Sequence, residues 1–158
     1  MSNVPYIPEG YNTVTPYLMV KGAAEAIEYY KKVFGATVVV RMDGPGGRIA
    51  HAELKIGDSI IMLADENPQM AVPGHGSATA IGGSPVSLYL YLPDVDSVVK
   101  KAVDAGAKIL KPVQDQFYGD RSGFLQDPFG HFWGIATHVE DVSPEEMKER
   151  MKKMMPAA

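Results

Sequence analysis

Thr15-Pro-Tyr17-Leu-Met-Val20 and Ser87-Leu-Tyr89-Leu-Tyr-Leu92 are the two stretches of this sequence that decide the fold. Each reads as an apolar strand, and each is followed by an amphipathic helix that ends at a Gly-Ala pair, Gly35-Ala36 or Gly106-Ala107. The strands begin 72 residues apart and the Gly-Ala pairs lie 71 residues apart. A half-sheet of this size cannot cover its own apolar face. We therefore predict two copies of one βαβββ module, at residues 13–64 and 85–140, and an α+β fold.

Three segments lie outside the two modules. Residues 1–12 are polar and rich in Pro and Gly, which predicts an N-terminal arm. Residues 65–84 show little periodicity, and they form either a linker or a flap over a binding cleft. Residues 141–158 read as a C-terminal amphipathic helix, because Ser143-Pro-Glu-Glu146 is a capping box. Its apolar stripe would dock on the body or on a second subunit, and consists of Met147, Met151, Met154 and Met155.

The composition excludes several classes of protein. The chain has 158 residues, a net charge of −4 and no cysteine. A mildly acidic chain argues against general nucleic-acid binding, and the lack of cysteine excludes disulfides and zinc-thiolate sites. Neither a signal peptide nor a run of about 20 apolar residues is evident. We therefore expect no membrane contact and a cytoplasmic location.

Three phrases of the sequence carry a resemblance to a known family. They are Ala23-Ala-Glu-Ala-Ile-Glu-Tyr-Tyr-Lys-Lys-Val-Phe-Gly-Ala36, His51-Ala-Glu-Leu-Lys-Ile-Gly-Asp58 and Asp127-Pro-Phe-Gly-His-Phe-Trp133. Together with the repeat, they resemble the vicinal oxygen chelate superfamily, which contains glyoxalases, bleomycin-resistance proteins and dioxygenases, and most of all its PhnB-like branch. The resemblance implies paired βαβββ modules that form a curved mixed sheet with a cleft, and it implies a homodimer.

The resemblance also implies four positions for a divalent metal, on the first and last strand of each module. The first-strand positions fall on Thr15 and Ser87, and the last-strand positions fall on Met62 (or Ile61) and Gly134. No imidazole or carboxylate stands at any of them, and the residues present are poor ligands for such an ion. We therefore expect no metal and no other cofactor.

An aromatic ligand would suit a cleft without these metal ligands. We expect Tyr17, Met62, Tyr89 and Trp133 to line it beside Thr15, Ser87 and Gly134, although the large apolar residues could equally fill the core. The predicted loop at residues 116–123 would add Phe117 and Tyr118 as walls. Arg121 would either pair with Asp120 or present its guanidinium to a ligand anion.

His51 and Glu53 are the candidate catalytic residues. They lie two apart on a predicted strand, so both point to one face. On that face they could bind a metal or act as a base with its orienting partner. Alternatively, they belong to a solvated row that Lys55 continues.

These observations leave three functions open. The first is a metal-free binding protein that sequesters a small aromatic or cationic compound. The second is a glyoxalase-like, metal-dependent lyase or isomerase that uses non-standard ligands, among them His51 and Glu53. The third is a structural or partner-binding dimer whose working surface is the methionine stripe.

Overall fold

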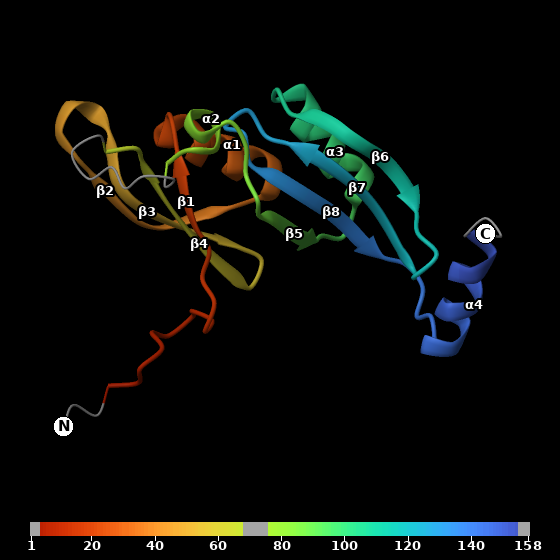
Figure 1. Cartoon of the computed structure of the whole chain (residues 1–158). Coiled ribbons are helices and arrows are strands. Elements are labelled where there is room, and N and C mark those ends of the chain that lie inside the picture. The colour runs from red at the N-terminus through yellow and green to blue at the C-terminus, as the bar shows by residue number, and fades with distance from the viewer. Residues whose placement is uncertain (1–3, 68–75, 155–158) are drawn as a thin grey trace. The chain divides into compact units, whose positions relative to one another are not determined.

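The protein consists of two compact units, Met1–Ser84 and Pro85–Ala158. The computed structural model in Figure 1 describes residues 4–67 and 76–154. Met155 of the predicted apolar stripe and residues 68–75 of the predicted linker or flap lie outside these residues.

Unit 1 is a four-stranded mixed sheet with one long helix on one face (Figure 1). The strand order is β1-β4-β3-β2; β1 and β4 run parallel, and the other neighbours run antiparallel. The sheet elements and their connections are β1 (Tyr17–Val20), α1 (Ala23–Phe34), β2 (Thr37–Asp43), the 3-10 turn η1 (Pro45–Gly47), β3 (Ile49–Ile56), β4 (Ser59–Asp65) and the short helix α2 (Ala78–Ile81).

Unit 2 repeats this arrangement and adds a C-terminal helix. Its strand order is β5-β8-β7-β6. The first and last strands of the module, β5 and β8, again run parallel to each other. The elements are β5 (Ser87–Tyr91), α3 (Val95–Asp104), β6 (Lys108–Asp115), β7 (Asp120–Gln126), β8 (Phe132–His138) and α4 (Pro144–Met154). The predicted α+β fold, with two four-stranded mixed sheets and a C-terminal helix, is confirmed.

Local sequence explains the limits of the two long helices. Helix α1 ends where Gly35 adopts a left-handed conformation with φ of 69°, which costs glycine little. Helix α3 is capped by Asp94, whose carboxylate accepts a hydrogen bond from the Ser97 N–H at 3.0 Å. Both helices present an apolar stripe to their sheet, because their buried residues recur at helical spacing.

Strand alternation divides each sheet into two faces. One face packs on the helix and forms the core, with Leu54 and Leu63 fully buried in unit 1 and Leu125 and Ile135 in unit 2. The residues between them point to the other face, which we call the helix-free face. The helix-free face is where side chains can meet a ligand.

One polar side chain in each unit ties the last strand to the start of the helix. The Asp65 carboxylate accepts hydrogen bonds from the Gly22 and Ala23 N–H groups at 2.9 and 2.8 Å. The Thr137 hydroxyl, 72 residues further on, accepts one from the Val95 N–H at 2.9 Å. The repeat therefore includes this connection as well as the strands.

The observed elements differ from the predicted ones in three places. Strand β1 begins at Tyr17 rather than Thr15, and residues 65–84 contain helix α2. Strand β7 begins at Asp120, so part of the predicted loop at 116–123 is strand. Gly123 weakens the strand pattern there, and that is why the sequence reads as a loop.

Helix α4 is attached to unit 2 mainly through polar contacts. The predicted cap is present, since the Ser143 hydroxyl accepts a hydrogen bond from the Glu146 N–H at 3.2 Å. Arg150 pairs with Glu140 at 2.7 Å, and its guanidinium also donates to the Phe117 carbonyl at 3.4 Å. No described residue of α4 is fully buried; Met147 is half-buried, and Met151 and Met154 are exposed.

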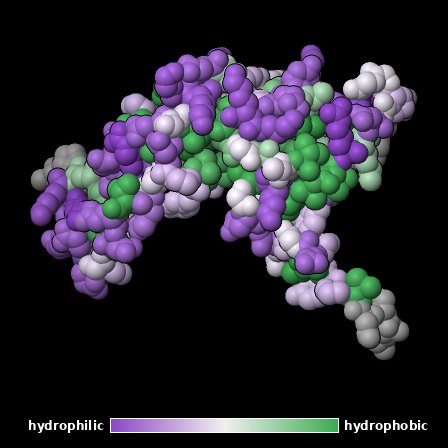
Figure 2. All heavy atoms as spheres, turned by 180° about the vertical axis from the view of Figure 1, so that it is seen from behind, coloured by the Kyte–Doolittle hydropathy of each residue, from purple (hydrophilic) through white to green (hydrophobic). Residues whose placement is uncertain are grey.

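Hydrophobic residues are also present on the surface. Figure 2 shows them as green patches among predominantly purple, hydrophilic side chains. Tyr17 of β1 and Tyr89 of β5 are each about half exposed. Among the described residues, no helix is long and apolar enough to cross a membrane.

Candidate functional site

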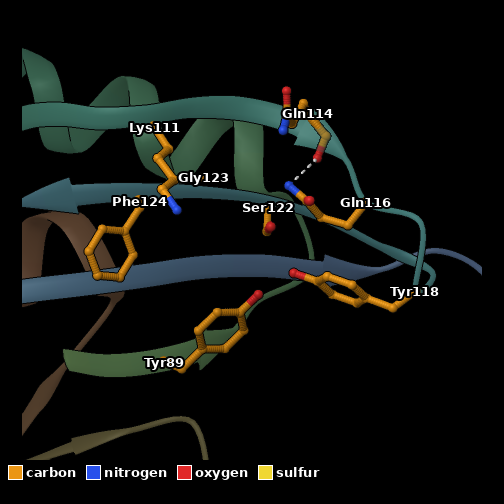
Figure 3. A pocket seen from close by; sticks show the side chains of 8 residues that line it. All are labelled: Tyr89, Lys111, Gln114, Gln116, Tyr118, Ser122, Gly123 and Phe124. Atoms are coloured by element: carbon orange, nitrogen blue, oxygen red, sulfur yellow. Dashed lines mark hydrogen bonds between the residues drawn. The ribbon is translucent and has the colours of Figure 1, made fainter. Parts of the chain in front are cut away.

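Unit 2 carries a hollow of about 290 Å³ on its helix-free face. Figure 3 shows its lining, with the rings of Tyr89, Tyr118 and Phe124 around the opening and polar side chains along one side. The residues come from β5, β6, β7 and the connection between β6 and β7: Tyr89, Lys111, Gln114, Gln116, Tyr118, Ser122, Gly123 and Phe124.

The absence of a side chain at Gly134 positions the Tyr89 ring. Tyr89 on β5 lies opposite Gly134 on β8. A Cβ atom at Gly134 would lie only 2.3 Å from Tyr89 Cδ2 and 2.6 Å from Cε2. The phenol ring therefore lies directly on the backbone of β8, and it forms an aromatic wall beside Phe124, which pairs with Gly134 from β7.

Hydroxyl and amide groups supply the polar part of the lining. Figure 3 shows the phenol oxygens of Tyr89 and Tyr118 pointing toward each other, and Ser122 adds a hydroxyl to the lining. Burial, together with Tyr118, raises the pKa of Tyr89 to about 12, so this phenol is neutral at physiological pH. The Gln116 amide donates to the Gln114 carbonyl at 3.4 Å. The lining can therefore both donate to and accept from a neutral polar group.

The charge of the lining residues indicates which ligands the hollow can accept. Lys111 is the one charged residue among the described residues that line it, and it is exposed. Because no carboxylate stands among these lining residues, the hollow suits neutral and anionic ligands better than cations. The cationic compound considered from the sequence has no counter-charge there.

Arg121 does not lie in the hollow, which corrects one prediction. Its guanidinium donates to both Asp96 oxygens, at 2.7 and 2.8 Å, and to Asp115 at 3.0 Å. These two carboxylates raise the pKa of Arg121 further. Arg121 follows Asp120 on β7, so the two side chains point to opposite faces of the sheet. The guanidinium is thus used to tie β6 and β7 to helix α3.

The expected Asp120–Arg121 pair is also wrong, because Asp120 has other partners. Its buried carboxylate accepts a hydrogen bond from the Tyr91 hydroxyl at 2.8 Å and contacts His138 Nδ1 at 2.8 Å. His138 Nε2 lies 2.9 Å from Asp141. The hydrogen bonds to Asp120 and then Asp141 raise the pKa of His138. This network links strands β5, β7 and β8 to the segment that follows β8.

Trp133 belongs to the core and not to the ligand-binding face. It is fully buried, and its indole N–H donates to the Asp127 carboxylate at 2.8 Å. Asp127 also accepts from the N–H groups of Phe129 and His131, each at 2.9 Å. Trp133 precedes Gly134 on β8 and therefore points to the helix-covered face. It anchors the Asp-Pro-Phe-Gly turn.

The remaining aromatic candidates of unit 2 divide in the same way. Tyr118 lines the hollow, whereas Phe117 does not. The Phe117 and Tyr118 rings meet edge to face, with their centroids 5.2 Å apart. Phe117 thus contacts the wall of the hollow from behind.

In unit 1, the candidate residues meet on the helix-free face of the sheet. Tyr17 lies opposite Met62, and Met62 lies opposite Glu53 on its other side. The Tyr17 hydroxyl is 2.9 Å from His51 Nδ1, and His51 Nε2 is 3.0 Å from Glu53. Tyr11, in the predicted arm, donates to the second Glu53 oxygen. The structure therefore brings together Tyr17, Met62, His51 and Glu53.

The residues at the four expected metal positions do not fit a divalent ion. Thr15 precedes β1 and its hydroxyl donates to the Asn12 carbonyl at 3.1 Å, while Ser87 opens β5 opposite Phe132. Met62 offers a thioether, and the space over Gly134 is filled by the Tyr89 ring. The described part of the chain contains no group of three His, Cys, Asp or Glu residues placed to hold a metal.

Several residues of these two faces escaped the sequence analysis. They are Lys111, Gln114, Gln116, Ser122 and Phe124 around the hollow, and Tyr11 beside Glu53. Ser122 and Phe124 could have been found from the repeat, because they occupy the positions in the second module that His51 and Glu53 occupy in the first. Tyr11 has no such signal, since it reaches Glu53 from 42 residues away.

Comparison with known proteins identifies the family. The model of the Glyoxalase/Bleomycin resistance protein/Dioxygenase superfamily matches residues 10–135. The chain therefore belongs to this superfamily.

Individual relatives agree with this assignment. An uncharacterised protein of Mycobacterium tuberculosis is 39% identical over 138 residues, which cover 87% of this chain and 81% of that protein. Among solved structures, TioX from Micromonospora sp. ML1 is similar with a TM-score of 0.64 and 26% identity, covering 81% of this chain and 99% of TioX. The PhnB protein from Bacillus cereus shares the fold with a TM-score of 0.62 at 21% identity, covering 80% and 99% of the two chains.

Proposed function

We propose that this protein binds a small aromatic compound in the hollow of unit 2 and sequesters it without a metal. The observation that carries the proposal is the set of three aromatic rings, Tyr89, Tyr118 and Phe124, that line the hollow, with the Tyr89 ring packed on the backbone at Gly134. Ligand sites of this kind combine apolar walls with a few polar groups that fix orientation. A volume of about 290 Å³ lies at the lower end of the range for such sites, which suits a ligand of one or two rings.

The metal-dependent alternative has less support. A metal held by His51 and Glu53 would have to replace hydrogen bonds that occupy both nitrogens of His51 and both oxygens of Glu53. No third carboxylate or imidazole completes a site among the described residues. A lyase or isomerase that depends on a Lewis acid therefore lacks a matching donor set in this part of the chain.

The expected homodimer and cytoplasmic location belong to the same proposal. Sequestration requires only that the folded chain bind the compound, so neither feature affects the argument for the hollow. Native mass spectrometry of freshly purified protein would report the subunit number, any metal and any co-purified compound in one measurement.

Three naphthalene derivatives with different charges test the proposal. Thermal unfolding is measured with 1-naphthoate, 2-naphthol and 1-naphthylmethylammonium at equal concentrations. Binding to the native state alone raises the midpoint, because it adds about RT ln(1 + [L]/Kd) to the free energy of unfolding. We expect a rise with the anion and the neutral phenol, and little change with the cation.

Substitution shows whether the rise comes from the hollow. Phe124→Ala should abolish it, since it removes one wall, whereas Tyr6→Ala should leave it unchanged, because Tyr6 is 94% exposed and lies outside the hollow. An equal rise in both variants would show that the compounds bind elsewhere. No rise with any compound in the natural protein would contradict the proposed ligand class.

A further inference from the structure

Four side chains form a continuous hydrogen-bonded row on the helix-free face of unit 1. Tyr11 donates to Glu53, Glu53 contacts His51 Nε2 at 3.0 Å, and the Tyr17 hydroxyl lies 2.9 Å from His51 Nδ1. Exposure increases along the row: Glu53 is 9% exposed, the His51 side chain 23% and Tyr17 49%. The row thus leads from a buried carboxylate to a phenol that a solute can reach.

The ionisation of Glu53 fixes the direction of the hydrogen bonds. The hydrogen bonds from His51 and then Tyr11 hold the pKa of the Glu53 carboxyl below its ordinary value. An ionised carboxylate can only accept, so a neutral His51 must carry its proton on Nε2. Nδ1 is then the acceptor, and Tyr17 is the donor. His51 is positioned to remove the phenolic proton of Tyr17.

Carboxylate, imidazole and hydroxyl in this order are the arrangement that activates a nucleophile. The hydroxyl lies within hydrogen-bond reach of a base, and a third group orients that base. We propose that Glu53, His51 and Tyr17 form a nucleophilic site in which the Tyr17 oxygen attacks the electrophilic centre of a small activated acyl compound. This site consists of residues of unit 1 alone, and it needs no metal.

The step balances without another reactant. A bond forms between Tyr17 Oη and the acyl carbon, and the bond from that carbon to its leaving group breaks. The phenolic proton moves to His51 Nδ1, and Glu53 stabilises the resulting imidazolium. Burial, followed by the charge of Glu53, raises the pKa of Tyr17, so the phenolate is not formed in advance. The proton must therefore leave during the attack, as in hydroxyl nucleophiles that a histidine activates.

The second repeat indicates that the fold does not require this row. Tyr89 takes the place of Tyr17, since Tyr89 lies opposite Gly134 as Tyr17 lies opposite Met62. At the places of His51 and Glu53, unit 2 has Ser122 and Phe124. The same sheet forms with a hydroxyl and a phenyl ring there. The ionisable row is consequently a feature of unit 1 and is not needed to build the module.

Covalent labelling of the full-length protein tests the proposal. The probe is p-nitrophenyl acetate, an activated acyl compound that transfers its acetyl group to an activated phenol and releases p-nitrophenolate. Peptide mass spectrometry measures the labelling rate of each tyrosine in the same sample. Tyr6, which is 94% exposed, serves as the internal reference. We expect Tyr17 to react at least about 10-fold faster than Tyr6, since general-base catalysis contributes about 10²-fold or more.

Variants separate proton removal from simple positioning. In His51→Asn, the amide oxygen can still accept from Tyr17 but cannot take its proton, so the Tyr17 rate should fall to that of Tyr6. Added imidazole should restore part of the rate in His51→Ala, which a purely structural role for His51 would not allow. Glu53 is a positioning residue, and Glu53→Gln should lower the Tyr17 rate while leaving the Tyr6 rate unchanged.

Two results would overturn the proposal. One is a Tyr17 rate no higher than the Tyr6 rate in the natural protein, a comparison that needs no variant to fold. The other is an unchanged Tyr17 rate in His51→Asn. Failure of the naphthalene compounds to bind would affect only the hollow of unit 2, so the two proposals fail separately.

Discussion

Replacing Gly134 by alanine tests the packing on which the hollow of unit 2 depends. The added Cβ would lie 2.3 Å from Tyr89 Cδ2, and ordinary contact begins at 3.4 Å, so the ring must move by at least about 1.1 Å. Gly134 is not among the glycines with positive φ, so alanine suits its backbone. The conflict therefore lies with the Tyr89 ring alone.

The expected cost follows from two opposing contributions. Overpacking typically costs about 1–3 kcal/mol, and replacing a strand glycine by alanine returns about 0.5–1 kcal/mol. We expect Gly134→Ala to lower the free energy of unfolding by about 0.5–2 kcal/mol. Tyr89 is about half exposed, so its ring can turn outward, and the variant should stay folded but lose the naphthoate-induced rise of the unfolding midpoint.

A double-mutant cycle with Tyr89→Ala isolates this contact. Urea unfolding gives the free energy for the natural protein, the two single variants and the double variant. With the ring removed, Gly134→Ala should cost nothing or should stabilise the protein slightly. An equal cost in both backgrounds would refute the reasoning, because it would show that the alanine clashes with something other than Tyr89.

Three further predictions concern the core, the histidine network and the metal. Trp133→Phe should lower the free energy of unfolding by about 1–3 kcal/mol in urea titrations, because it leaves a void and removes the hydrogen bond to Asp127. The raised pKa of His138 means that its protonated form stabilises the fold; this contribution is complete below the unfolded value near 6.5 and disappears as the pH rises through the higher folded pKa. His138→Gln should therefore be destabilising at pH 5.5 and approach the natural protein at alkaline pH, and a gap that is constant across the series would be inconsistent with this assignment. Treatment with EDTA should leave the thermal midpoint unchanged within about 1 °C, because a metal bound only by the native state would stabilise it; a clear fall would identify a bound ion.

Local periodicity and turn chemistry were sufficient to predict most of the fold. Helix α1 occupies the predicted residues, Ala23–Phe34, since its apolar spacing and Gly35 agree with each other. The second helix, α3, likewise ends just before Gly106-Ala107, as predicted. These features depend on neighbours in the sequence, and the repeat supplied independent support for each of them.

The site residues were harder to predict, because they depend on which face of the sheet each strand residue points to and on partners that are distant in the sequence. Trp133 and Gly134 are adjacent, and a shift of one residue decides which of them faces the helix. Arg121 was expected either to pair with Asp120 or to face a ligand anion, but its partner Asp96 lies 25 residues away on α3. A pattern of neighbouring residues cannot reveal a partner at that separation in the sequence. The His51 and Glu53 pair was recognisable because both residues belong to one strand, whereas Tyr17 joins them only through the order of strands in the sheet.

The two polar ties, Asp65 and Thr137, have a consequence for how such a protein can change. Each fastens its module at the junction of last strand and helix, away from the surface where a solute would arrive. Mutations on that surface can therefore accumulate in one half without loosening either half. A duplicated module of this kind can acquire two unrelated chemistries, one per copy, while both copies keep the same means of holding together.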